Sequence, residues 1–134
     1  MSTNNANRYF YGVGRRKASA ARAKFYPVEA ELKISINGKE AKNYLPSFYM
    51  STLENFFTNV GINNGEFQIF VNGGGVNGQT DAVRLAIAKS LVKQDESHKT
   101  ILRQFGYLTT DIRKVLPKRP GLRKARKREQ WSKR

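Results

Sequence analysis

A strongly basic C-terminal segment constrains this chain more than any other feature. Residues 113–134 contain eleven lysine and arginine residues and one acidic residue, Glu129, so the segment holds a net charge of +10 out of +15 for the whole chain. After Pro120 only Leu122 and Trp131 are large and apolar. Because like charges repel and almost nothing can be buried, we expect the segment to be disordered in isolation. A polyanion is its implied partner.

The remainder of the chain has the size and composition of one folded domain. It holds 14 basic and nine acidic residues, so the charge is concentrated in the tail rather than spread evenly. A chain of 134 residues can bury one core and is too short for two domains plus such a tail. The expected organisation is a disordered N-terminus at residues 1–8, a globular domain at 9–112 and a basic extended tail at 113–134.

Composition also excludes several kinds of chemistry and location. The chain has no cysteine, which rules out disulfides, thiolate metal sites and a thiol nucleophile and is compatible with a reducing compartment. The first residues are polar, and no window approaches the roughly 20 apolar residues that a membrane span requires. We expect a soluble, unexported protein with no membrane partner. A pI near 10.4 together with 11% aromatic residues is typical of a nucleic-acid binder.

The first half of the domain has the periodicity of strands followed by a helix. Residues 19–26 and 31–36 alternate between apolar and polar side chains, and Asn37-Gly38 predicts a tight hairpin turn after them. Ser51-Thr52-Leu53-Glu54 has the form of a capping box, which predicts a helix from Ser51 to Val60 that stops at Gly61.

The second half predicts a strand, a glycine turn and two helices. Phe67, Ile69 and Val71 alternate in the strand, and a helix begins near residues 77–81. Apolar residues lie on two sides of that helix, which makes it the expected central helix; they are Val83, Ile87 and Leu91 on one side and Leu85, Ala88 and Val92 on the other. A further helix is expected from Asp95 to Phe105. The mixture and order of elements predict an α+β fold with a small mixed sheet.

The glycine turn matches a nucleotide-binding motif but lacks the context of one. Gly73-x-Gly75-x-x-Gly78 has the letters of the dinucleotide fingerprint, yet no second strand ending in an acidic residue follows. Gln79 stands where a P-loop needs lysine. Two interpretations remain open. The glycines form a tight turn, or the backbone amides at the helix N-terminus face an RNA phosphate with help from Arg84.

A second basic cluster lies near the N-terminus. Arg15, Arg16 and Lys17 follow Gly12 and Gly14, and three aromatic residues, 9–11, precede them. Aromatic rings beside cations suit unpaired bases and phosphates, although such residues are also common in ordinary strands.

The chain offers little for catalysis or for a cofactor. His98, the single histidine, is expected on a helix surface, and the carboxylates Asp81, Asp95, Asp111 and Glu66 form no recognisable catalytic or metal-ligand set. We expect no enzyme activity, no cofactor and no metal.

Four motifs in order carry a resemblance to a known family. The sequence of residues 9–134 closely resembles the S nine family of small ribosomal subunit proteins, of the bacterial type, through Gly12–Lys17, Gly73–Arg84, Gly121–Arg126 and the terminal Gln130–Arg134. The resemblance implies an α+β domain with left-handed βαβ topology, like the second domain of ribosomal protein S five. It also implies a cytoplasmic protein of the ribosome with small-subunit rRNA, neighbouring head proteins and peptidyl-site tRNA as partners, and no homo-oligomer.

The resemblance and the charge pattern together indicate which residues contact RNA. In this family the tail threads through rRNA of the subunit head to the peptidyl site, so Ser132, Lys133 and Arg134 are the expected tRNA contacts. The expected rRNA contacts are the cations Arg15, Arg16, Lys17, Arg22, Arg84, Arg113, Lys118, Arg119, Arg123, Lys124, Arg126, Lys127 and Arg128. The alternatives are a nucleotide-binding enzyme that uses the glycine turn, and a basic protein that coats nucleic acid or an anionic membrane nonspecifically.

Overall fold

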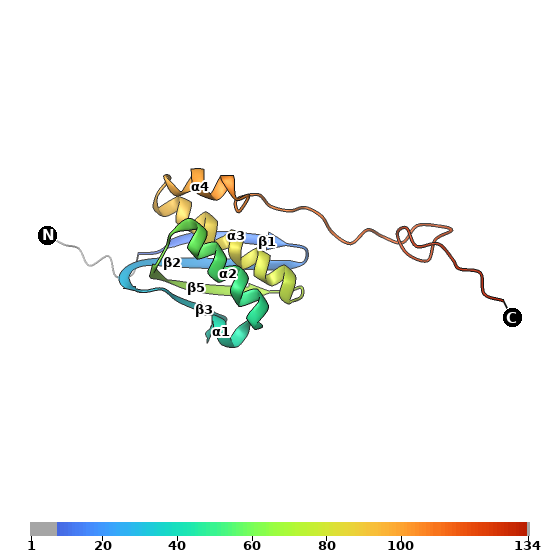
Figure 1. Cartoon of the computed structure of the whole chain (residues 1–134), viewed down its shortest axis with the longest axis horizontal. Helices are drawn as coiled ribbons and strands as arrows, with labels where there is room; N and C mark the ends of the chain where they lie inside the picture. The colour runs from blue at the N-terminus through green and yellow to red at the C-terminus, as the bar shows by residue number, and fades with distance from the viewer. Residues whose placement is uncertain (1–7, 134) are drawn as a thin grey trace.

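The computed structural model describes residues 8–133, which form one mixed sheet, four helices and a long C-terminal extension (Figure 1). The strands are β1 (Phe10–Arg16), β2 (Ser19–Glu31), β3 (Lys33–Ile36), β4 (Lys39–Glu40) and β5 (Asn64–Asn72). The helices are α1 (Ala41–Tyr44), α2 (Ser47–Val60), α3 (Val76–Gln94) and α4 (His98–Gln104). Of the expected disordered N-terminus, all but Arg8 lies outside the described residues.

The five strands form a single sheet in the order β1-β2-β5-β3-β4. β2 pairs antiparallel with both β1 and β5, while β3 runs parallel to β5 with Ile36 opposite Ile69. The parallel pair is connected through α1 and α2, which makes a βαβ unit. The predicted α+β fold is confirmed, and the arrangement is consistent with the second-domain-like fold of ribosomal protein S five.

Both long helices cover the same face of the sheet (Figure 1). The odd-numbered residues of β2 and β5 point toward them, and Ala21, Ala23, Phe67 and Ile69 are almost fully buried. The even-numbered residues of the same strands point to the opposite face, which no described helix covers. This one-sided burial explains the alternation seen in the sequence.

The predicted central helix is confirmed as α3. Its residues Val83, Leu85, Ile87, Ala88 and Leu91 are all buried, because α2 lies along one side and β1 and β2 along another. Small residues bring α3 close to the sheet. A Cβ atom on Gly12 would overlap the carbonyl oxygen of Ala86, so glycine is the residue that fits there.

The predicted start of α2 is wrong by one turn. The helix begins at Ser47 after Pro46, and the Ser51 hydroxyl donates a hydrogen bond to the Ser47 carbonyl instead of capping a helix end. The extra turn forms because Tyr49 and Met50 pack against the core, a tertiary contact that outweighs the local capping signal. The predicted end is confirmed, since Gly61 adopts a left-handed conformation with φ of 81°.

Two further boundaries also differ from expectation. The helix expected from Asp95 starts at His98, because the Asp95 carboxylate accepts the backbone N–H of Ser97 at 3.0 Å and holds a turn between α3 and α4. β2 continues past Tyr26 to Glu31 through an irregularity in its pairing with β5. The hairpin turn at Asn37-Gly38 is confirmed, with φ values of 52° and 81°.

Candidate nucleic-acid interface

The C-terminal extension presents its cations to solvent. Between Thr109 and Lys133 the structure contains no helix or strand, and the chain runs away from the domain (Figure 1). Every described lysine and arginine from Arg113 to Lys133 is exposed, and so is Trp131 at 85%. A small turn, in which Arg123 donates its backbone N–H to the Lys127 carbonyl at 2.8 Å, is the main interruption. The extension therefore offers an exposed row of predominantly positive charge.

An ion-pair cluster joins the base of this extension to the domain. Arg16 at the end of β1 contacts the carboxylate of Asp111 and lies 3.5 Å from that of Asp81 on α3. Arg84, one turn further along α3, lies 3.4 Å from Asp81. Only 16% of the Arg16 side chain is exposed, so these contacts are partly shielded from water. We call Arg16, Asp81, Arg84, Asp111 and Arg113 the anchor cluster.

Within the anchor cluster, Asp111 is held firmly in its charged form. Its carboxylate accepts hydrogen bonds from the Arg113 side chain at 2.7 and 3.0 Å and from the Arg113 backbone N–H at 2.9 Å. These bonds, with a further contribution from the charge of Arg16, hold the pKa of Asp111 well below its ordinary value. The same pair raises the pKa of Arg113. The anchor cluster fixes the point at which the extension leaves the domain.

The predicted rRNA-binding residues of the domain thus divide into two groups. Arg15, Lys17 and Arg22 are exposed, with Lys17 at the turn between β1 and β2 in a left-handed conformation of φ 53°. Arg16 and Arg84 belong to the anchor cluster, and the Arg84 guanidinium also lies 5.2 Å from the centre of the Tyr107 ring. Arg15, Arg16 and Lys17 are adjacent in the sequence, but their environments differ. The fold exposes Arg15 and Lys17 and places Arg16 in the anchor cluster.

A cavity of about 220 Å³ opens beside the anchor cluster. Arg15, Arg16, Arg84 and Arg113 supply four positive charges to its lining against the two carboxylates of Asp81 and Asp111. The net charge of the lining is therefore positive, which suits an anionic neighbour such as phosphate. The sequence motifs could not predict this grouping, since its charged members come from three separate parts of the chain.

The uncovered face of the sheet carries a second group of cations with aromatic residues. Lys24 and Arg22 of β2 lie beside Phe70 of β5, and Lys24 also lies 5.0 Å from the centre of the Tyr9 ring. Phe70 and Tyr9 are 43% and 42% exposed. Sequence motifs did not single out Phe70. The alternation of the strand could have identified it, because Phe70 falls on the opposite face from the buried Phe67, Ile69 and Val71.

The glycine turn is explained by close packing. Gly73 and Gly74 have φ values of 74° and 64°, which glycine adopts without strain. A Cβ atom on Gly73 would stand 2.5 Å from the Ala18 carbonyl oxygen, and one on Gly74 would overlap the Ser19 hydroxyl. Ser19 and Gln79 both donate hydrogen bonds to the Gly73 carbonyl, each at 3.0 Å. Of the two open interpretations, this geometry supports the tight turn.

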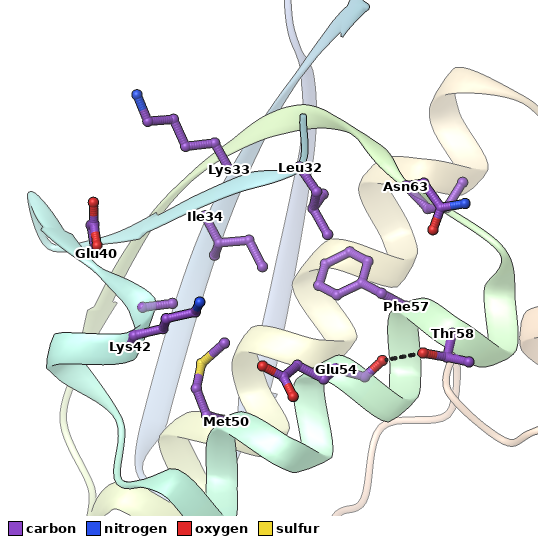
Figure 2. Close-up of a pocket in the computed structure, with 12 residues that line it drawn as sticks. Leu32, Lys33, Ile34, Glu40, Lys42, Met50, Glu54, Phe57, Thr58 and Asn63 are labelled. Carbon is purple, nitrogen blue, oxygen red and sulfur yellow. Dashed lines mark hydrogen bonds between the residues drawn. The ribbon is translucent and has the colours of Figure 1, made fainter. Parts of the chain in front are cut away.

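A separate groove lies between β3 and α2 and has a volume of about 430 Å³ (Figure 2). Leu32, Ile34, Met50 and Phe57 form its apolar floor, and its ionisable residues are two lysines and two glutamates at the rim: Lys33, Lys42, Glu40 and Glu54. The groove contains no histidine and is separate from the glycine turn, so it offers no continuation of the nucleotide-binding motif.

Residues 8–133 hold neither a metal-ligand cluster nor a membrane-spanning helix. No group of three or more histidine, aspartate or glutamate side chains there is placed to hold a metal ion. No helix in the same part of the chain is both long and apolar enough to cross a membrane.

Comparison with known families agrees with this geometry. The model of the family described as Ribosomal protein S9/S16 matches residues 14–134, which is nearly the whole chain and includes both the anchor cluster and the basic extension. The resemblance drawn from the sequence motifs is confirmed.

Proposed function

Since this chain belongs to the Ribosomal protein S9/S16 family, it is a structural protein of the small ribosomal subunit that binds rRNA, and we propose that its C-terminal tail also reaches tRNA in the peptidyl site. Its partners are rRNA and other ribosomal proteins. The observation that carries the proposal is an exposed, extended segment of concentrated positive charge that leaves a folded domain at a fixed point.

The domain and the tail have different tasks in this proposal. Residues 9–112 fold as a unit and dock on rRNA of the subunit head, while the tail beyond Arg113 orders only when it binds RNA. Fully extended, 22 residues reach roughly 70 Å, which is enough to connect a surface-bound domain with a distant functional site. Pro117 and Pro120 oppose collapse into a helix.

We assign the direct rRNA contacts to the cations that are exposed. Arg15, Lys17 and Arg22 contact rRNA phosphates directly from the domain, and Arg16, Arg84 and Arg113 contribute the net positive field of the anchor cluster. Along the tail the contacts are Lys118, Arg119, Arg123, Lys124, Arg126, Lys127 and Arg128. Each phosphate neutralised releases counterions, so affinity depends strongly on salt.

The tRNA contacts lie at the tip of the tail. Ser132 and Lys133 are exposed, whereas Arg134 lies outside the described residues and enters the proposal from its position in the sequence. Two cations at the end of an extended segment neutralise phosphates of the tRNA anticodon stem-loop, and the neighbouring Trp131 offers an exposed ring for stacking.

A pair of charge-matched variants tests the tRNA role. Lys133→Gln with Arg134→Gln removes two cations from the tip, and Lys127→Gln with Arg128→Gln removes two from the middle of the tail. Small subunits containing each variant are assembled, and peptidyl-site tRNA affinity is measured by filter binding. The tip variant should weaken tRNA binding at least about tenfold, the value of one charged hydrogen bond, with normal subunit assembly. The mid-tail variant should leave tRNA affinity unchanged. Equal tRNA affinity for the tip variant and the wild type would contradict the tRNA role.

A further inference from the structure

One face of the sheet is left uncovered by the fold. Helices α2 and α3 both pack on the opposite face, where the odd-numbered residues of β2 and β5 are buried (Figure 1). The even-numbered residues of these strands consequently share an open surface. A single exposed aromatic residue needs no special explanation, but several grouped together on one open surface indicate a contact with a partner.

Five residues form the centre of this open surface: Tyr9, which precedes β1, with Arg22, Lys24 and Tyr26 of β2 and Phe70 of β5. We call them the open-face cluster. The strand register brings these residues together, because Arg22 lies opposite Phe70 across the β2–β5 pair. The Tyr9 and Tyr26 rings lie 5.7 Å apart between centres. The Lys24 ammonium lies 5.0 Å from the Tyr9 ring centre and 5.9 Å from that of Phe70.

The cations of the open-face cluster are not neutralised by acids. The ion pairs among residues 8–133 involve Arg16, Arg84 and Arg113, and neither Arg22 nor Lys24 takes part in one. Glu66 is an acidic residue of this face that lies opposite Tyr26, and its carboxylate accepts a hydrogen bond from Gln68 at 3.3 Å. Arg22 and Lys24 instead lie beside aromatic rings at cation–π distances. They remain available to an anionic partner.

We infer that the open-face cluster binds unpaired nucleotides of rRNA, with Phe70 and Tyr9 stacking on bases while Arg22 and Lys24 neutralise the flanking phosphates. This inference rests on the proposed rRNA-binding function. Unpaired nucleotides fit because a base in a duplex has both faces covered by its neighbours, whereas a splayed base can lie flat on an exposed ring.

A protein partner fits the same surface less well. Covering Arg22 and Lys24 with ordinary protein would remove two charges from water without a counter-charge, which is unfavourable. An RNA strand supplies a phosphate beside each base and so satisfies the rings and the cations together. The pairing of exposed rings with unneutralised cations is the property that favours RNA.

An oligonucleotide with and without bases separates stacking from phosphate binding. The probes are a single-stranded RNA of twelve uridines and the same strand with abasic residues at its six central positions. Affinities of the full chain are measured by fluorescence anisotropy at about 0.5 M KCl, where the phosphate contribution of the tail is reduced. The variants are Phe70→Ala, Phe70→Leu and Phe70→Trp, and Phe48→Ala is the matched control because Phe48 on α2 is 74% exposed on the helical side.

The inference predicts a loss that depends on the bases. Phe70→Ala should weaken binding of the uridine strand by roughly 5- to 150-fold, the range measured for loss of one stacked base, and should leave the abasic strand nearly unchanged. Phe70→Leu should lose affinity similarly while keeping an apolar side chain, and Phe70→Trp should retain it. Phe48→Ala should bind both strands as the wild type does. Circular dichroism of each variant checks that it is folded.

Two other results would overturn the inference. Unchanged affinity of Phe70→Ala and Phe70→Leu for the uridine strand would mean that the open face does not stack on bases and is free for a protein. An equal loss on both strands would assign the effect to phosphate contacts alone. Neither result would affect the rRNA-binding function itself, which would instead be contradicted if the wild-type chain failed to bind RNA at low salt.

Discussion

Gly14 of β1 and Ala82 of α3 meet backbone to backbone: a Cβ atom on Gly14 would overlap the Ala82 carbonyl oxygen and stand 2.6 Å from the Ala86 amide nitrogen. Neither backbone group is the end of a flexible side chain, so neither can move aside cheaply. Together with Gly12, this contact lets α3 lie directly on β1. It thereby positions Arg16 beside Asp81, since both residues lie close in sequence to the contacting positions.

Gly14→Ala should therefore destabilise the domain. Forcing a methyl group into a well-packed contact costs about 1–3 kcal/mol or more, and the free energy of unfolding from urea titration measures the loss. Gly75→Ala is the control, because a Cβ atom there has no neighbour within 4 Å and φ is −101°. The control should change stability by less than about 1 kcal/mol. Equal effects of the two substitutions would show that the close approach is not limiting.

Acid should weaken the attachment of the tail through Asp111. Because the pKa of Asp111 is lower in the folded protein than its ordinary unfolded value near 3.9, the carboxylate stabilises the fold above about pH 4. That contribution is lost as the pH falls below this value toward the folded pKa. Asp111→Asn should thus lower stability at pH 6 and differ progressively less from the wild type as the pH drops below 4.

Thermal unfolding monitored by circular dichroism at several pH values measures this difference. Glu129→Gln serves as the control, because it removes one carboxylate from the exposed tail without touching the anchor cluster. It should follow the wild-type curve throughout. A difference between Asp111→Asn and the wild type that stays constant from pH 6 to pH 2 would argue against the ionised carboxylate as the source of stability.

Periodic features of the sequence predicted the strands β2, β3 and β5 and the central helix, because their cause is local. Phe67, Ile69 and Val71 occupy every second position because one face of β5 is buried. This alternation is visible within a few consecutive residues of the sequence. The Arg16–Asp111 contact joins positions 95 apart in the sequence, so no local pattern reveals it. The sequence therefore does not distinguish Arg16 from its neighbour Arg15, although Arg16 lies in an ion-pair cluster and Arg15 does not.

Boundary predictions were wrong where tertiary contacts competed with local signals. Ser51 and Glu54 satisfy the pattern of a capping box, yet Tyr49 and Met50 pack on the core and draw the helix start back to Ser47. Phe70 was missed for a different reason. The composition of a β-strand does not by itself distinguish an exposed aromatic residue from a buried one. Pairing with β2 shows that it shares the open face with Arg22.

Asn37 should be a key residue for the β3 edge of the sheet. Its side chain accepts the backbone N–H of Val71 at 2.9 Å and donates to the Val71 carbonyl at 3.0 Å, so it continues the ladder beyond Ile36 as a backbone group would. Asn37→Ala leaves both Val71 groups without these partners and places alanine at a φ of 52°. The expected cost is about 2 kcal/mol in urea unfolding.

Two further variants separate hydrogen bonding from backbone strain at Asn37. Asn37→Gly removes the side chain and relieves the strain, so it isolates the hydrogen bonds. Asn37→Asp keeps the acceptor for the Val71 N–H and replaces the donor by an oxygen that faces the Val71 carbonyl. Asn37→Gly should recover part of the alanine loss but not all of it. Full recovery would attribute the whole effect to strain.

Removing the tail should flatten the salt dependence of rRNA binding. A chain that ends after Arg113 keeps the anchor cluster intact and deletes the ten cations from Lys114 to Arg134. The slope of log affinity against log salt concentration should fall by roughly 0.7 for each single-stranded phosphate, and about 0.9 for each duplex phosphate, that the tail no longer neutralises. If the tail neutralises about five phosphates, the slope should fall by about 4. Filter binding to small-subunit rRNA between about 0.1 and 0.5 M KCl provides the measurement.

A tail of unchanged composition with a shuffled order of residues 114–134 supplies the matched control. Because counterion release depends on the number of neutralised phosphates and not on their order, the shuffled chain should keep the wild-type slope. It should nevertheless bind peptidyl-site tRNA poorly, since its final residues no longer place lysine and arginine at the tip. A truncated chain with the wild-type slope would locate the rRNA contacts in the domain, on Arg15, Lys17 and Arg22, and would leave the tail without a role in rRNA affinity.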